Sequence, residues 1–260
     1  MLQLKQLSKS FSSSFKPILS EFSLTLKKGD FCVLLGSNGS GKSTLLKALS
    51  GEYTLDSGTI LLDQQVITSL PIHARASFIS SVSQDIARGT VQELTLLENL
   101  SLSLKRGKKA SFSPFSRQRQ YLCHQIAALN LGLEQYLDTP LSALSGGQKQ
   151  MIATVMATLC QPKLLLLDEH CSALDPKAQS MLMAFTARMV QEHQITTLMI
   201  THNLNDALNY GNRLIMLHEG NIVVDMNDKQ KRAASISQLL NMFHTYEDST
   251  FINKKEYCYA

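Results

Sequence analysis

A glycine-rich segment near the N-terminus has the residue types and spacing of a phosphate-binding loop. It reads Gly36-Ser-Asn-Gly-Ser-Gly-Lys42-Ser43 and matches the pattern G-x-x-x-x-G-K-[ST]. Its glycines let backbone N–H groups converge on phosphate oxygens, and the positive end of a following helix adds to the attraction. Lys42 can reach the terminal phosphates, and the Ser43 hydroxyl can bind Mg²⁺. The predicted nucleotide contacts are Gly36, Ser37, Asn38, Gly39, Ser40, Gly41, Lys42, Ser43 and Thr44.

The sequence on either side of this loop supports the interpretation. An apolar strand is predicted over residues 31–35 and a helix over residues 44–50, which is the context that the motif requires. A chance loop rich in glycine and serine is the alternative, and the context disfavours it.

Two adjacent acids supply the carboxylates that a nucleotide site needs. Asp168 and Glu169 follow the apolar run Leu164–Leu167, which predicts a buried strand. Ligands of open α/β sheets bind at the carboxyl ends of strands. We expect Asp168 to hold Mg²⁺ and Glu169 to polarise the attacking water. Alone, such a pair is more often an ordinary strand end, and the phosphate loop tips the balance towards function.

A second helix start has an anion-binding character of its own. Ser145 and Gln148 form an S-x-x-Q capping box, and Gly146 and Gly147 leave the first turn uncovered. Such an end can receive an anion, although an ordinary capped helix is the simpler interpretation of these residues in isolation.

The order of elements predicts an α/β fold. Strands and turns dominate the first 35 residues, and a mostly helical section over 91–141 suggests an inserted subdomain. Strands over 163–167 and 196–200 alternate with helices over 146–160 and 176–192, which indicates a mostly parallel sheet covered on both faces. The final elements predicted are a hairpin over 213–217 and 221–224 and a polar tail with Ile236, Leu239, Leu240 and Phe243 at helical spacing.

Composition narrows the class of protein. A chain of 260 residues can bury a full core, and a net charge of +4 is too small to indicate a dedicated nucleic-acid binder. The five cysteines contain no C-x-x-C pair, which favours a reducing, cytoplasmic compartment. The N-terminus lacks the apolar run of a signal peptide, and no stretch is long enough for a membrane helix. Any action at a membrane is therefore expected to need a partner.

The motifs together resemble the ABC ATPase family. Leu144-Ser-Gly-Gly-Gln148, about twenty residues before Asp168, resembles its signature motif. Gln84 resembles the Q-loop glutamine, Ser172-Ala-Leu-Asp175 the D-loop, and His202 the switch histidine. The resemblance extends from about Leu2 to Val224. It implies a P-loop NTPase core with a mostly parallel sheet, an N-terminal antiparallel β subdomain and an inserted α-helical subdomain.

The resemblance also implies a division into domains. The ABC ATPase domain is expected over residues 1–227, with its helical subdomain at about 91–160. Residues 228–260 are expected to form a short C-terminal tail that is partly helical.

The resemblance assigns roles to several residues. His202 is expected to contact the γ-phosphate and orient the water, and Gln84 to sense Mg²⁺ and couple the site to a partner subunit. In the family, the signature binds ATP held by the opposite subunit, which implies a dimer with two shared sites. The signature contacts expected here are Ser145, Gly146, Gly147 and Gln148, with Asp175 organising the other chain's site.

An aromatic ring upstream of the phosphate loop is expected to stack on adenine. Phe11 matches best, and Phe15 remains a competitor because the segment Ser12-Ser-Ser-Phe15 makes the alignment uncertain. Either ring could instead belong to the core.

One departure from the family pattern is His170, because proline most often follows the catalytic glutamate. This segment, with Ala173-Leu-Asp-Pro176, resembles a subgroup of uptake ATPases that accompany binding proteins associated with aromatic amino acids. The resemblance implies an ATP- and Mg²⁺-dependent dimer at the cytoplasmic face of the membrane. Its expected partners are a transmembrane permease and an extracytoplasmic solute-binding protein, with no nucleic acid.

Other functions remain open at this point. An exporter or lipid-extracting ATPase is the alternative within transport, and an ATPase acting on DNA or the ribosome is the alternative outside it. The single motif set without sustained heptads disfavours the latter. A regulatory module without turnover is disfavoured by the intact Lys42, Asp168, Glu169 and His202. The six basic residues between Lys105 and Arg119 predict a solvated loop or a surface for anionic lipid or the membrane partner.

Overall fold

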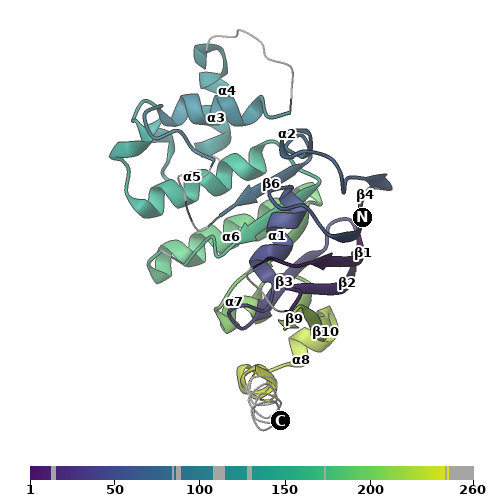
Figure 1. The fold of residues 1–260 in the computed structure, drawn as a ribbon. Helices are drawn as coiled ribbons and strands as arrows, with labels where there is room; N and C mark the ends of the chain where they lie inside the picture. Colours follow the sequence, from purple (N-terminus) through teal and green to yellow (C-terminus); the bar gives the residue numbers. More distant parts are fainter. Residues whose placement is uncertain are drawn as a thin grey trace, which may run out of the picture. The chain divides into compact units, whose positions relative to one another are not determined.

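The computed structural model describes most of the chain, as two compact units. The described residues are 1–12, 16–83, 85, 89–107, 115–127, 131–172, 174–243 and 245. The first unit joins Met1–Ser69 to Leu198–Ala260, and the second is Leu70–Thr197. Figure 1 follows the chain through both.

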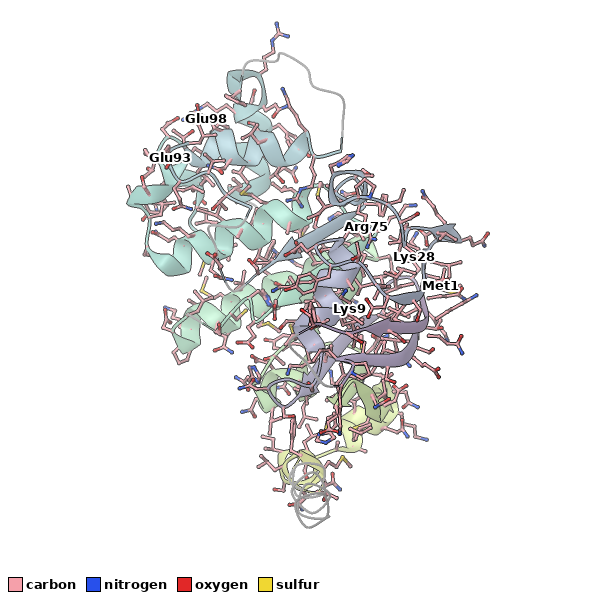
Figure 2. The ribbon with its side chains drawn as sticks, viewed as in Figure 1. Met1, Lys9, Lys28, Arg75, Glu93 and Glu98 are labelled. Atoms are coloured by element: carbon pink, nitrogen blue, oxygen red, sulfur yellow. The ribbon has the colours of Figure 1, made fainter. Side chains whose placement is uncertain are left out.

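An antiparallel sheet opens the first unit. Its strand order is β2-β1-β4-β5, with β1 (Leu2–Lys9), β2 (Leu19–Leu26), β4 (Ser57–Leu62) and β5 (Gln65–Val66). Leu2, Leu4 and Leu7 of β1 are buried, and Figure 2 labels Lys9 at the end of this strand. The Lys9 ammonium lies 3.1 Å from the Asp56 carboxylate. The predicted N-terminal antiparallel subdomain is confirmed.

A second strand group of the first unit positions the phosphate loop. In β3 (Phe31–Gly36) all six residues are buried, as expected for a strand covered on both faces. It pairs in parallel with β9 (Arg213–His218), and α1 (Lys42–Ser50) packs against it. The loop therefore lies between a central strand and the helix that follows it.

The hairpin predicted near residue 220 is confirmed. β10 (Asn221–Asn227) runs antiparallel to β9, with His218 paired to Asn221. Glu219 and Gly220 both have positive φ, 43° and 77°, which is the backbone of a type I′ turn.

The C-terminal part of the first unit is helical. α7 (Leu204–Asn209) precedes β9, and α8 (Asp228–Ala233) follows β10. A further helix covers residues 236–243, where the spacing of apolar residues predicted one.

The second unit contains a parallel strand pair and most of the long helices. β6 (Ile79–Val82) pairs in parallel with β7 (Leu164–Asp168). The principal helices are α3 (Leu96–Leu104), α4 (Arg119–Ala127), α5 (Gly146–Leu159) and α6 (Pro176–His193), with the short α2 (Ile72–Arg75) before β6. Single 3₁₀ turns lie at Phe115–Gln118, Glu134–Tyr136 and Leu141–Ala143. β8 (Thr196–Ile200), buried throughout, crosses the division between the units.

The helical section of the second unit is held by packing and capping. α3 packs against α5, and Thr95 and Glu98, the latter labelled in Figure 2, close a capping box at the start of α3. Within the described residues, no helix is long and apolar enough to cross a membrane.

Two residues of the basic segment have partners inside the second unit. Arg106 donates to the Ser80 hydroxyl at 3.1 Å, and Arg119 makes a two-pronged contact with the Asp138 carboxylate. These contacts favour a structural role for both side chains. Lys108 and Lys109 lie outside the described residues.

Candidate nucleotide site

The phosphate loop folds around its own lysine. The Lys42 side chain is 6% exposed, and its ammonium donates to the carbonyls of Gly36 and Ser37, each at 2.8 Å. The Ser40 hydroxyl lies 3.4 Å away. The positive charge is therefore fixed at the centre of the loop, where an incoming phosphate would meet it.

The start of α1 leaves its backbone donors without a side-chain cap. The capping residue is Gly41, with φ 101°, and it makes no side-chain capping hydrogen bond. The first N–H groups of a helix have no partner within the helix, so this end is suited to an anion.

Gly36 is required by close approach of two strands. Its φ is 150°, and a Cβ there would lie 2.3 Å from the carbonyl oxygen of Leu217 on β9. A Cβ at Gly39, by contrast, would meet nothing within 4 Å, although the φ of this residue is 81°. The first glycine thus fixes the loop against β9, and the second is required by the left-handed backbone of the turn.

The acids follow the predicted strand. Leu164 to Leu167 are buried, and Asp168 ends β7. Glu169 has φ 50°, and its carbonyl accepts from the Ser172 backbone N–H at 3.0 Å and hydroxyl at 2.9 Å. A left-handed glutamate is uncommon, and such backbones concentrate at functional sites.

His170 lies behind this turn. It is 1% exposed, and its Nε2 is 3.4 Å from the Thr186 hydroxyl of α6. That hydroxyl donates to the Leu182 carbonyl at 2.8 Å, so the imidazole Nε2–H is the donor to Thr186. Burial lowers the pKa of His170 from 6.5 to about 4, which keeps the ring neutral near neutral pH.

The helix start at Ser145 has the predicted capping box. The Gln148 N–H donates to the Ser145 hydroxyl at 3.3 Å, and the Ser145 N–H donates to Gln148 Oε1 at 2.9 Å. A Cβ at Gly146 would meet nothing within 4 Å. This end of α5 is therefore open on the Gly146 side.

Asp175 has a structural role that the motif did not reveal. Its carboxylate accepts from the backbone N–H groups of Lys177 and Ala178, at 3.1 and 3.0 Å, and so caps α6. Pro176 follows as the first helical residue.

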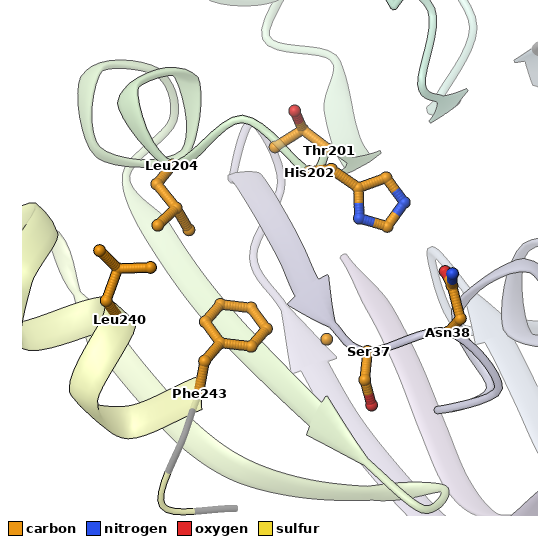
Figure 3. Close-up of a pocket in the computed structure, with 8 residues that line it drawn as sticks. Ser37, Asn38, Thr201, His202, Leu204, Leu240 and Phe243 are labelled. Carbon is orange, nitrogen blue, oxygen red and sulfur yellow. The ribbon is translucent and has the colours of Figure 1, made fainter. Parts of the chain in front are cut away.

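His202 lies in a pocket beside the phosphate loop. The pocket measures about 440 Å³ (Figure 3). Next to the histidine, Asn203 caps α7 by accepting from the N–H groups of Asn205 and Asp206. The lining residues are Gly36, Ser37, Asn38, Thr201, His202, Leu204, Leu240 and Phe243.

The C-terminal lining of this pocket was missed at the level of sequence. Leu240 and Phe243 were expected in a helix of the tail but assigned no part in the site. The sequence shows apolar residues at helical spacing here, which predicts a helix but not what that helix packs against.

Of the two aromatic rings considered for the adenine contact, Phe11 lies within the described residues. Phe11 packs edge to face against Tyr53, with ring centres 5.2 Å apart, and the Lys9 ammonium lies 5.3 Å from its ring centre. Phe15 and the predicted metal ligand Gln84 lie outside the described residues. The choice of Phe11 for adenine stays a prediction.

The predicted site residues divide between the units. The first unit brings together the phosphate loop and His202, and it also contains Phe11. The second carries the acids, the signature and Asp175.

Comparison with known proteins identifies the family. The family described as ABC transporter matches residues 19–172, more than half of the chain. The chain belongs to the ABC transporter family, as one of its ATP-binding domains.

The relatives of this ABC domain agree. It is 44% identical over 247 residues to the tyrosine transport ATP-binding protein of Clostridioides difficile, covering 94% of this chain and 98% of that one. It is 33% identical to the spermidine/putrescine import ATP-binding protein PotA of Haemophilus influenzae, covering 88% of this chain and 59% of PotA.

Solved structures place the domain among ATPases. The dimeric post-hydrolysis structure of the ATP-binding cassette MJ0796 with ADP and Pi has a TM-score of 0.75 and 27% identity. The match covers 88% of this chain and 99% of MJ0796. The ABC domain described here is an ATP-binding ATPase.

Replacing Gly36 tests the close approach of the loop to β9. Gly36→Ala is expected to lower the melting temperature and weaken ATP binding, because its Cβ would collide with the Leu217 carbonyl. Gly39→Ala is the control for stability: it keeps the backbone strain of about 1–2 kcal/mol but meets no protein atom within 4 Å. Thermal unfolding compares the two variants and ATP titration measures binding by Gly36→Ala; equal losses of melting temperature in the two variants would contradict the assigned role.

Burial of His170 predicts acid sensitivity. Between pH 6.5 and about 4 the unfolded chain binds a proton that the folded chain does not, so the free energy of unfolding falls as the pH falls. The full loss is up to about 3 kcal/mol. Urea unfolding across this range should show a flatter dependence in His170→Gln than in wild type. The exposed His193→Gln should keep the wild-type dependence; a wild-type slope in His170→Gln would contradict the assignment.

Proposed function

We propose that the chain powers the uptake of a small solute, with an aromatic amino acid as the favoured substrate class. Support for import comes from relatives named for spermidine/putrescine import and thiamine import, and a further relative is named for tyrosine transport. The observation that carries the substrate class is the 44% identity to the tyrosine transport protein, which extends over nearly the full length of both chains.

Within this proposal the phosphate loop binds ATP with Mg²⁺. Lys42 neutralises the terminal phosphates from its buried position, and backbone N–H groups at the start of α1 bind the phosphate oxygens. The metal would be held by the Ser43 hydroxyl, Asp168 and Gln84, and it would spread the charge of the phosphates.

Hydrolysis is proposed to depend on two further side chains. Glu169 acts as the general base that takes a proton from the attacking water, and His202 orients that water against the γ-phosphate. The location of His202 in one pocket with Gly36, Ser37 and Asn38 supports its part.

We further propose that two copies share the nucleotides. The N-terminal end of α5, with Ser145 to Gln148, would bind the γ-phosphate held by the other copy, and its exposed Gly146 suits that approach. The likeness to dimeric cassettes supports this arrangement. A transmembrane permease and an extracytoplasmic binding protein complete the proposed system, with the ATPase at the cytoplasmic face of the membrane.

Removing the proposed base separates binding from turnover. Glu169→Gln should lower phosphate release by about 100-fold or more, because an amide cannot accept the proton of the water. ATP affinity should remain close to wild type. Glu192→Gln, an exposed acid on α6, should change neither quantity. Wild-type phosphate release by Glu169→Gln would remove Glu169 from its assigned role.

The uptake proposal is tested in cells that lack this chain. Uptake of labelled tyrosine should fall in the deletion strain and return with the wild-type chain. Lys42→Ala should not restore it, because the loop loses the ammonium at the phosphate position. The exposed Lys28→Ala should restore it. Tyrosine uptake that is unaffected by the deletion would reject the substrate class, without touching the ATPase assignment.

A further inference from the structure

The segment after β10 is anchored to the helix that follows His202. Lys231 of α8 is only 2% exposed, and its ammonium donates to the carbonyls of Tyr210 and Gly211, the latter at 2.8 Å. These carbonyls follow directly after α7, which ends at Asn209. A cation at the C-terminal end of a helix satisfies free carbonyls and opposes the negative end of the helix dipole. α8 is therefore fastened to the far end of α7.

The near end of α7 and the same segment line one pocket with apolar side chains. Leu204, the first residue of α7, lines the pocket with Leu240 and Phe243 of the helix over 236–243. In Figure 3 these three side chains lie on one side of the pocket, and the His202 ring lines the same pocket. Leu239, next to Leu240 in sequence, is fully buried and holds the helix to the unit.

α7 itself is too short to fix its own position. It has six residues and follows His202 after the single capping residue Asn203. A helix of this length is marginal without tertiary contacts. α7 packs against β3 and buries Ala207, and contacts at its two ends add to this support for the backbone that follows His202.

We propose that the C-terminal segment 228–243 is a positioning element for His202. Lys231 holds one end of α7, and Leu240 with Phe243 support the other through Leu204. The segment thereby sets the rate of ATP hydrolysis while leaving ATP affinity to the phosphate loop, whose lysine is held by β3 and the loop itself. The inference rests on the proposed role of His202 in hydrolysis.

The first test removes the apolar support. The double variant Leu240→Ala/Phe243→Ala should lower kcat for ATP by at least ~10-fold, because small displacements of a positioned group are costly. The KM for ATP should stay within about twofold, since uniform binding is untouched. Ile236→Ala, also apolar and part-exposed on the same helix but outside the pocket, should keep wild-type values. A wild-type kcat in the double variant overturns the proposal.

The second test removes the clamp at the other end. Lys231→Met keeps most of the buried stem but loses the two hydrogen bonds, so it should lower kcat with little change in KM. Thermal unfolding checks that both variants are folded. Because Leu240 is 42% exposed, the double variant at Leu240 and Phe243 decides the question if Lys231→Met does not fold.

A double-mutant cycle assigns the effect to His202. If the segment acts through the histidine, adding Leu240→Ala/Phe243→Ala to His202→Ala should cause no further loss of kcat. Fully additive losses would overturn the proposal. A wild-type kcat for His202→Ala would instead reject the proposed role of the histidine, which separates that failure from failure of the segment's role.

The last experiment distinguishes a helix that positions His202 from a helix that contacts a second copy of the chain. In the Glu169→Gln background, ATP-induced dimerisation measured by light scattering should be the same with and without Leu240→Ala/Phe243→Ala. Loss of the dimer would assign the helix to the interface between two copies and overturn the positioning proposal.

Discussion

The buried ammonium of Lys42 is the constraint on which the site depends. A cation with so little exposure is stable only where oxygens surround it, and the carbonyls of Gly36 and Ser37 provide them. Those carbonyls converge because Gly36 lies against β9 at a distance that excludes any side chain. The all-buried strand β3 and the parallel pairing with β9 thus fix a positive charge in the loop that we propose binds the phosphates of ATP.

Residues from the early and the late parts of the chain line one pocket of the first unit. β3 and α1 lie early in the sequence, whereas His202, α7 and the C-terminal helix come from its last quarter. Leu240 and Phe243 of the C-terminal helix line the same pocket as His202. In the proposed mechanism, the contacts at both ends of α7 link the C-terminal segment to His202, and through that residue to turnover.

Much of this could be predicted from the sequence because the signals were local. The strand, loop and helix around Lys42, the capping box of Ser145 and the hairpin at Glu219 each depend on residues close in sequence. Long-range contacts gave no such signal: nothing local says that Lys231 caps α7. Likewise, Asp175 was recognisable as part of a motif, and its capping of α6 emerged only with the helix in place. The neutral, buried state of His170 also required the packing of α6 around it.

The most direct test of the account is a crystal structure of Glu169→Gln with Mg²⁺ and ATP. We expect the Lys42 ammonium within hydrogen-bond distance of β- and γ-phosphate oxygens, with residues 145–148 of a second copy at the same γ-phosphate. A nucleotide bound with no phosphate oxygen near Lys42 would contradict the central claim. So would a γ-phosphate that is enclosed by a single copy.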